Sequence, residues 1–224
     1  MANIFGVTHL AGATQNKNDG KLSRIQLENR AAISEAALDV FSTDGYRGAT
    51  IDRIAERAGM SKTNLLYYFG SKEEVYATVI EQTVEEWLQP FKDIDPDGDP
   101  IEEIRKYISI KLKMSAQKPE ASKLFANEIQ RGAPLMGKFL RTRLKALVDE
   151  KAEVIRSWID DGKLAPVDPY HLVFMIWATT QHYADFDTQV EAILGSAVRK
   201  PGFQEQVGQA VLSVVLNGIR PRDE

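Results

Sequence analysis

Apolar residues recur with a helical period along most of the chain, and long runs with a period of two are nearly absent. The first such segment spans about residues 28–44. Its apolar positions fall at i, i+3, i+4, i+7 and i+8: Ile33, Ala36, Ala37, Val40 and Phe41. Gly45 follows this segment, as expected of a left-handed helix stop. The pattern therefore predicts an all-α protein.

Two short helices are expected after the first one. Thr50 is suited to cap a helix that ends at Ala58, and Ser61 a second helix that ends at Phe69, with Gly59 in the turn between them. Two short helices joined by a glycine-containing turn are typical of a helix-turn-helix, whose second helix enters the major groove of DNA. Four apolar side chains are expected to close the small core behind it: Phe41, Ile54, Ala55 and Leu65.

The polar positions of these two helices suit a DNA contact surface. Free backbone N–H groups at the start of the second helix favour phosphate, and short polar side chains there can reach base edges. The predicted contact residues are Thr50, Ser61, Lys62, Thr63, Asn64, Tyr67, Tyr68 and Lys72. A short polar helix also fits a solvated surface, and Tyr68 is equally suited to partial burial against the following helix.

The remaining signals divide the chain into further helices. Ser71-Lys72-Glu73-Glu74 has the form of a capping box and opens a fourth helix that ends near Pro90, before a linker over 93–100. More helices are predicted over about 100–117, 120–131, 135–161, 169–185 and 203–218. The expected domains are a disordered arm over 1–27, a DNA-binding domain over 28–72, and a ligand-binding and dimerisation domain over 73–224.

Composition narrows the possible function classes. The chain has 224 residues, of which 43 % are hydrophobic, enough to bury a sizeable core. It has no cysteine, which excludes disulfides and thiolate metal sites. No run approaches the roughly 20 apolar residues that span a bilayer, and residues 1–20 lack the pattern of a signal peptide. We therefore expect a cytoplasmic protein without a membrane partner.

The net charge of −4 is unusual for a protein that binds nucleic acid. Its distribution is uneven, because residues 1–72 hold nine Lys and Arg against seven Asp and Glu. Residues 45–72 alone hold five basic side chains and two acidic ones. Local rather than total charge attracts a protein to phosphates, so the charge pattern is compatible with a DNA-binding head.

An enzyme is the second class of function considered. The chain contains no HExxH, GxxxxGK[ST] or GxSxG motif, and no cluster with metal-ligand spacing. Its three histidines are His9, His171 and His182. The sequence thus predicts no catalytic residue, metal or cofactor. A DNA-binding scaffold that acts without a ligand is the third class.

The segment Gly59-Met-Ser-Lys-Thr-Asn-Leu-Leu-Tyr-Tyr-Phe-Gly-Ser-Lys72 resembles the signature of the TetR family of bacterial repressors. Residues 36–72 as a whole are similar to the head of that family. Residues 162–169 and 176–186 resemble the pyrimidine-utilisation regulators within it. The resemblance implies a homodimer that binds a near-palindromic operator and responds to a small effector, uracil or else thymine. A TetR-like regulator of a different small ligand is the alternative.

Aromatic and amide side chains of the larger domain suit a flat effector. Gln181 follows Trp177 by four residues and shares its helix face, and its amide mirrors the C=O and N–H edge of a pyrimidine dione. The predicted ligand residues are Trp87, Lys111, Phe125, Glu128, Trp177, Gln181 and His182. A solvated ion pair for Lys111 and Glu128, and a structural role for His182, are the alternatives.

The last helix is expected to contribute to the dimer, since it has a wide apolar surface: Val211, Leu212, Val214, Val215, Leu216 and Ile219. Burial within one subunit is the alternative. A two-fold dimer would pair this helix and the one over 169–185 with their copies. The two recognition helices would then lie about 34–36 Å apart.

Overall fold

The computed structural model describes residues 23–221, so most of the predicted arm, residues 1–22, lies outside the described residues. No strand occurs between residues 23 and 221, and the all-α fold is confirmed. The helices in chain order are α1 (Arg24–Gly48), α2 (Ile51–Arg57), α3 (Lys62–Tyr68), α4 (Lys72–Lys92), α5 (Pro100–Gln117), α6 (Pro119–Gln130), α7 (Gly137–Phe139), the π-helical turn η1 (Leu140–Leu144), α8 (Lys145–Asp160), α9 (Pro169–Asp185), α10 (Asp187–Leu194), the 3-10 turn η2 (Gly195–Arg199) and α11 (Phe203–Ile219).

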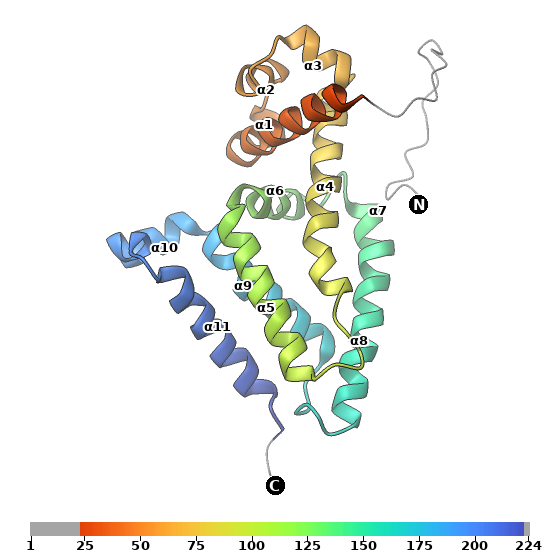
Figure 1. Cartoon of the computed structure of the whole chain (residues 1–224), viewed down its shortest axis with the longest axis vertical. Helices are drawn as coiled ribbons and strands as arrows, with labels where there is room; N and C mark the ends of the chain where they lie inside the picture. The colour runs from red at the N-terminus through yellow and green to blue at the C-terminus, as the bar shows by residue number, and fades with distance from the viewer. Residues whose placement is uncertain (1–22, 222–224) are drawn as a thin grey trace. The chain divides into compact units, whose positions relative to one another are not determined.

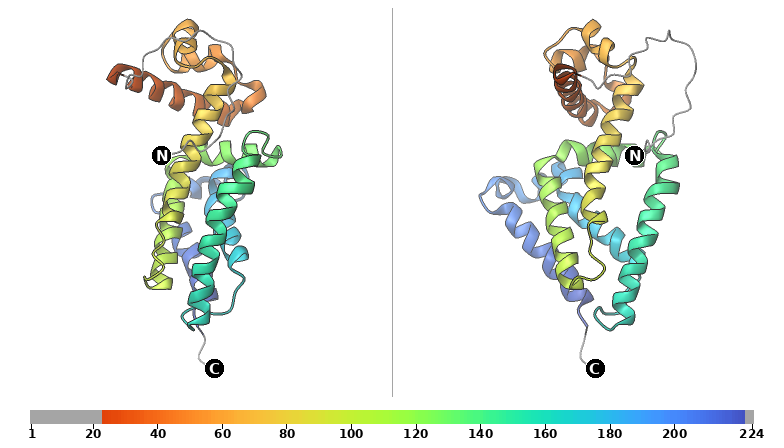
Figure 2. Two further views of the ribbon diagram at one scale, coloured as in Figure 1. Left: turned by 90° about the vertical axis from the view of Figure 1, so that its right-hand side faces the viewer. Right: turned by 45° about the vertical axis from the view of Figure 1, so that its right-hand side comes forward.

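Residue contacts divide the chain into two compact units, one up to Gln82 and one from Thr83 onwards. The division falls inside α4. In the first unit, which we call the head, α1 packs against α2 and α3 (Figure 1). In the second unit, which we call the body, α5, α9 and α11 pack together, and α6 crosses near one end of α5 (Figures 1 and 2).

Helix α1 begins earlier than the apolar pattern predicts. The Ser23 hydroxyl accepts a 3.3 Å hydrogen bond from the backbone N–H of Gln26, and the Gln26 side chain accepts a 2.8 Å bond from the N–H of Ser23. This reciprocal capping box starts the helix at Arg24. Residues 24–27, which the sequence pattern places in the arm, are therefore the first turn of α1.

The core of the head contains the four side chains predicted for it. Phe41, Ile54 and Leu65 are completely buried, and Ala55 is buried with them. The ring of Tyr76, near the start of α4, packs edge-to-face with the ring of Phe41, and the two ring centres lie 4.8 Å apart. Apolar contacts therefore fix α2 and α3 on α1, and they leave the polar positions of α3 to solvent.

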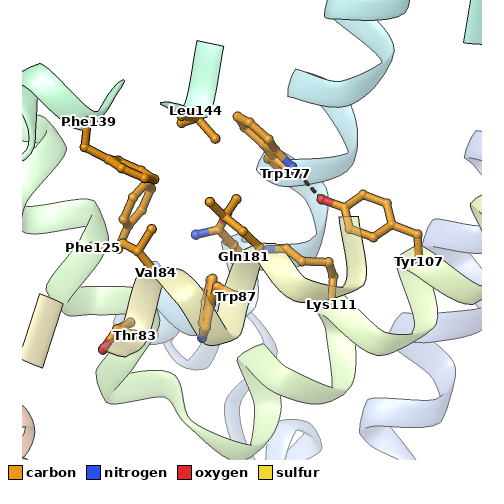
Figure 3. Close-up of a pocket in the computed structure, with 11 residues that line it drawn as sticks. Thr83, Val84, Trp87, Tyr107, Lys111, Phe125, Phe139, Leu144, Trp177 and Gln181 are labelled. Carbon is orange, nitrogen blue, oxygen red and sulfur yellow. Dashed lines mark hydrogen bonds between the residues drawn. The ribbon is translucent and has the colours of Figure 1, made fainter. Parts of the chain in front are cut away.

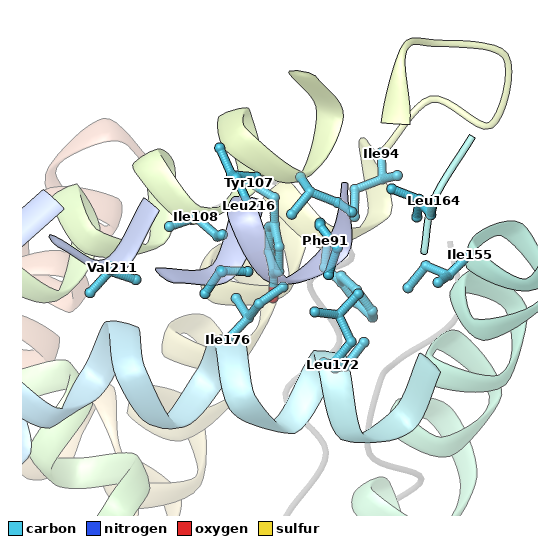
Figure 4. Packing of buried hydrophobic residues seen from close by; sticks show 14 of the residues in the cluster. Phe91, Ile94, Tyr107, Ile108, Ile155, Leu164, Leu172, Ile176, Val211 and Leu216 are labelled. Carbon is cyan, nitrogen blue, oxygen red and sulfur yellow. The ribbon is translucent and has the colours of Figure 1, made fainter. Parts of the chain in front are cut away.

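The body has a separate core formed by α4, α5, α8, α9 and α11 (Figure 4). Its buried members include Phe91, Ile94, Tyr107, Ile108, Ile155, Trp158, Leu172, Ile176, Val211, Val215, Leu216 and Ile219. Of the apolar face predicted on the last helix, four side chains are thus buried within the subunit. Val214 differs, because 73 % of its surface is exposed.

Three helix predictions need correction. Helix α4 continues past Pro90 to Lys92, since burying Phe91 in the body core holds the last turn although Pro90 has no N–H to donate. The single helix predicted over 135–161 is interrupted by the π-helical turn η1. Helix α10 and the turn η2 lie outside the predicted helices. Val190, Ile193 and Leu194 of α10 have helical spacing, but only Val190 is buried.

Candidate DNA interface and candidate ligand pocket

The turn between α2 and α3 is tight, as a helix-turn-helix requires. Gly59 has a φ of +68°, a conformation that favours glycine, and the Met60 N–H donates to the Ala55 carbonyl at 3.0 Å. The Thr50 and Ser61 hydroxyls each accept a 3.2 Å bond from a backbone N–H three residues later. Both residues therefore cap their helices as predicted, which occupies one acceptor site of each hydroxyl.

Helix α3 presents one polar face to solvent. Lys62, Thr63 and Asn64 are exposed in its first turn, and Tyr67 is 73 % exposed one turn later. Leu65, which lies between them in sequence, is completely buried. The predicted contact residues of α3 thus share an accessible face, except for Tyr68.

Tyr68 is half-buried against α1. Its hydroxyl accepts a 2.7 Å hydrogen bond from the amide of Asn29, and its carbonyl accepts one from Arg30. The Arg30 guanidinium also lies 4.0 Å from the centre of the Phe69 ring. The burial that was the alternative for Tyr68 is therefore against α1 rather than α4. These contacts fix the C-terminal end of α3 on the head.

Lys72 connects the start of α4 to the end of α1. Its ammonium donates to the carbonyls of Tyr46 at 2.9 Å and Ala49 at 3.0 Å, and it lies 4.5 Å from the centre of the Tyr46 ring. An ammonium has three donors, so one remains for a phosphate oxygen. The main role of Lys72 is therefore to link the start of α4 to the end of α1.

The basic residues of the head are largely paired with acids. Lys62 forms a 3.0 Å ion pair with Asp52, Arg57 a 2.7 Å pair with Asp39, and Arg53 pairs with Asp44. Asp39 and Asp44 precede residues 45–72, the segment with five basic and two acidic side chains, so the count over that segment leaves out two of the acidic partners. Because exposed pairs of this kind contribute little to stability, phosphate can replace the carboxylate at low cost.

A pocket in the body collects side chains from α4, α5, α6, α7, η1 and α9 (Figure 3). About 460 Å³ of space free of protein atoms lies among the lining residues, part of it open to solvent. Its lining consists of Thr83, Val84, Trp87, Leu88, Tyr107, Lys111, Phe125, Phe139, Leu144, Trp177 and Gln181. Five predicted ligand residues are thereby brought together: Trp87, Lys111, Phe125, Trp177 and Gln181.

Trp177 is held in the pocket by a side chain that the sequence pattern did not reveal. Its indole N–H donates a 2.7 Å hydrogen bond to the hydroxyl of Tyr107 on α5 (Figure 3). Burial raises the pKa of Tyr107 far above its usual range, so the hydroxyl stays protonated. Gln181 lies one turn along α9 and makes no side-chain hydrogen bond to another described residue. Its amide is available to a ligand.

Lys111 and Trp87 lie against each other in the pocket lining. Lys111 is 4 % exposed, and its ammonium nitrogen lies 4.1 Å from the centre of the Trp87 ring. Burial lowers the pKa of Lys111 to about 7, although Asp185 opposes the shift. The solvated ion pair that was the alternative for Lys111 is therefore wrong. The buried Trp87 indole N–H has no hydrogen-bond partner among residues 23–221.

Two predicted ligand residues are not in the pocket lining. Glu128 is completely buried and accepts a 2.8 Å hydrogen bond from the backbone N–H of Leu135. The Glu128 side chain is therefore not solvated. His182 is exposed on α9 and stacks on Phe186 at 5.2 Å. Sequence reasoning missed the pocket residues Thr83, Val84, Leu88, Tyr107, Phe139 and Leu144, whose apolar or hydroxyl side chains gave no distinctive motif.

Two further features are absent from the part of the chain that the structure describes. No helix within 23–221 has the length and apolar character needed to cross a bilayer. The same residues contain no group of three or more His, Asp or Glu placed to hold a metal ion.

Comparison with known proteins places both units in one class. Residues 33–79 match the family of bacterial regulatory proteins of the tetR family, and residues 80–222 match the C-terminal region of YcdC-like protein. The chain is a helix-turn-helix transcriptional regulator and belongs to the TetR family, as the sequence predicted.

Individual relatives narrow the class further. The HTH-type transcriptional regulator RutR of Escherichia coli K12 is 50 % identical over 206 residues, which cover 92 % of this chain and 97 % of RutR. The HTH-type transcriptional repressor NicS of Pseudomonas putida is 27 % identical, over 66 % and 70 % of the two chains. A solved structure, the putative transcriptional regulator SCO4942 from Streptomyces coelicolor, superposes with a TM-score of 0.69 at 26 % identity, over 87 % and 99 % of the chains. These relatives are transcriptional regulators rather than enzymes, and the chain is a RutR homologue.

Proposed function

We propose that the protein is a homodimeric regulator that binds a near-palindromic operator through α3. Its affinity for the operator falls when a small planar pyrimidine, uracil or thymine, occupies the pocket of the body. The observation that carries the effector assignment is the pairing of the Trp177 ring with the free Gln181 amide in one pocket. A flat ring with an adjacent acceptor and donor pair matches a cyclic dione.

The similarity to RutR supports the same assignment, because it extends over both units of the chain. It includes the segment from Trp177 to Gln181 that resembles the pyrimidine-utilisation regulators. Lys111 adds a hydrogen-bond donor to the pocket lining, and a dione offers two carbonyl acceptors.

Communication between pocket and head is proposed to run through α4. The helix starts at Lys72, which is bonded to two carbonyls of the head, and it carries Thr83, Val84 and Trp87 into the pocket lining. A ligand that displaces these side chains displaces the helix as well. Coupling of this kind commonly amounts to about 1–3 kcal/mol and is reciprocal, so operator binding weakens effector binding equally.

The proposed dimer surface lies on α9 and α11. Phe174 and Met175 of α9 are 51 % and 40 % exposed, and Val214 of α11 is 73 % exposed. Large apolar side chains left in solvent on neighbouring helices are typical of an interface. A two-fold axis would pair the same patch of both copies and repeat α3 about 34–36 Å away.

The experiment that tests the proposal uses operator DNA obtained by in vitro selection with the purified protein. Fluorescence anisotropy then gives the Kd for that DNA with and without uracil. We expect uracil to raise the Kd about 5-fold to 150-fold, the usual range of allosteric coupling. Thymine, other pyrimidines, purines and their breakdown products are tested in parallel. An unchanged Kd with every pyrimidine would refute the effector assignment, and failure to select any DNA would refute operator binding.

A further inference from the structure

Lys111 is the one charged side chain that lines the pocket. It is 4 % exposed, and its amine lies over the face of the Trp87 ring at 4.1 Å. Its recorded partners within 23–221 are the Trp87 ring and, through charge alone, Asp185, and neither is a hydrogen-bond acceptor in contact with the amine. A nearly buried amine without an acceptor from the protein is costly, because it has lost most of its hydration and gained no hydrogen bond.

The elements around Lys111 offer little to satisfy it. Helix α9 contributes Asp185, which acts on Lys111 through its charge while its carboxylate accepts a hydrogen bond from Ser122. On α5 the preceding turn contributes Tyr107, a neutral phenol bonded to Trp177. The lining side chains of α4, α6, α7 and η1 carry no charge, namely Thr83, Val84, Trp87, Leu88, Phe125, Phe139 and Leu144.

We propose that Lys111 anchors a carbonyl oxygen of the effector, and that effector binding at this amine is coupled to the uptake of a proton. This inference rests on the proposed function, because it takes a pyrimidine dione as the occupant of the pocket. It adds the atom that fixes the ligand and makes the pocket sensitive to pH as well as to effector concentration.

The direction of the pH effect follows from the two states of the amine. In the free protein the pKa of Lys111 is about 7, so amine and ammonium coexist near neutrality. A carbonyl oxygen in hydrogen-bond contact favours the ammonium and raises the pKa of Lys111 in the complex. Binding is then strongest below the pKa of the free protein. It weakens as pH rises above that value, until the pKa of the complex is reached.

Isothermal titration calorimetry of the full-length protein with uracil tests this directly. Titrations in phosphate and in Tris, which differ in ionisation enthalpy, give the number of protons taken up. With a free pKa near 7, we expect about half a proton at pH 7 and about 0.9 at pH 8, with a Kd about fivefold weaker at pH 8. Uptake of no proton at either pH would overturn the inference.

Three variants separate Lys111 from other titrating groups. In Lys111→Met we expect weaker uracil binding and no proton uptake. The matched control Lys113→Met removes an exposed lysine from the same helix and leaves both unchanged. In Asp185→Asn the opposing charge is lost, so the pH at which binding weakens should move lower. Proton uptake that persists in Lys111→Met, measured on protein with wild-type circular dichroism, would also overturn the inference.

The two proposals fail in different ways. If uracil and thymine do not bind the wild-type protein at any pH, both the effector assignment and the role of Lys111 fall. If uracil binds and weakens operator binding without proton uptake, the effector assignment stands and only the inference about Lys111 is wrong.

Discussion

The indole N–H of Trp177 and the hydroxyl of Tyr107 are joined by a 2.7 Å hydrogen bond across α9 and α5. The bond occupies the only polar atom of Trp177 and fixes the orientation of its ring. In the proposed complex Trp177 would therefore offer the ligand its aromatic surface, and the polar contacts would come from Gln181 and Lys111. The pocket is thus preorganised by a residue that need not touch the ligand itself.

Removing this hydroxyl in Tyr107→Phe should cost both stability and affinity. The Trp177 N–H would be left without its partner, a loss of about 1–3 kcal/mol in the free energy of unfolding. Urea unfolding followed by circular dichroism measures that loss, and calorimetry measures the accompanying rise in the Kd for uracil. Tyr170→Phe is the matched control, because that hydroxyl bonds the half-buried Asp149 outside the pocket. Equal stability of the two variants would show that the Trp177 bond is not important.

The fold was largely predictable because its helices begin with local signals. Ser61, Thr50 and Asp168 each cap the helix that follows, and Gly59 forms the turn, without help from distant residues. Where tertiary packing decides, prediction failed. Phe91 holds α4 together past a proline, and the break at η1 has no local marker in the sequence.

Lys72→Met tests whether Lys72 is mainly a structural link. The variant loses two charge-assisted hydrogen bonds, to the carbonyls of Tyr46 and Ala49. Bonds to a charged group contribute about 1.5–3 kcal/mol each, so we expect a clear drop in the urea midpoint before DNA is added. Lys106→Met, an exposed lysine of α5, should leave the midpoint unchanged. If the Lys72→Met protein is as stable as wild type, Lys72 is not a structural link, and contact with phosphate is the role left for it.

In contrast to Lys72→Met, Lys62→Ala should weaken DNA binding and leave the stability of the protein nearly unchanged. Lys62 is exposed and its pair with Asp52 is solvated, so stability should change by less than about 0.5 kcal/mol. If its ammonium meets a phosphate in the complex, operator binding weakens on every sequence. The slope of log Kd against log salt concentration then falls by about 1. Anisotropy titrations at several salt concentrations measure this slope, and an unchanged slope would place Lys62 away from the DNA backbone.

Asn64→Ala tests sequence recognition rather than general affinity. Asn64 is exposed in the first turn of α3, where an amide can pair with the edge of an adenine. Its loss should cost about 1–3 kcal/mol at the base pair it reads and much less elsewhere. Binding to a panel of single-base operator variants gives the pattern. Thr63→Ala, one residue earlier, should relax a different position. A uniform loss across the panel would indicate a backbone contact.

The sites were less predictable than the fold. Trp177 and Gln181 could be found because they lie one turn apart on the same helix. Glu128 and His182 are also polar and lie close in sequence to pocket residues, yet one bonds a backbone N–H and the other faces solvent. Their helix faces could be assigned only once the packing of α6 and α9 was known. The role of Tyr107 could not be predicted for the same reason, since its hydrogen-bond partner Trp177 lies on another helix.

Gln181→Ala should separate effector response from DNA binding. The side chain lines the pocket and makes no hydrogen bond within residues 23–221, so its removal should not disturb the head. We expect operator affinity to remain at the wild-type value and the effect of uracil on it to disappear. Anisotropy with and without uracil measures both quantities on the same sample.

Gln189→Ala, an exposed glutamine of α10, controls for the substitution itself. His182→Ala is the stricter comparison, because His182 is the next residue of α9 yet lies outside the pocket lining, and its response to uracil should persist. If His182→Ala loses the response and Gln181→Ala keeps it, the effector binds on a face of α9 other than the one that lines this pocket.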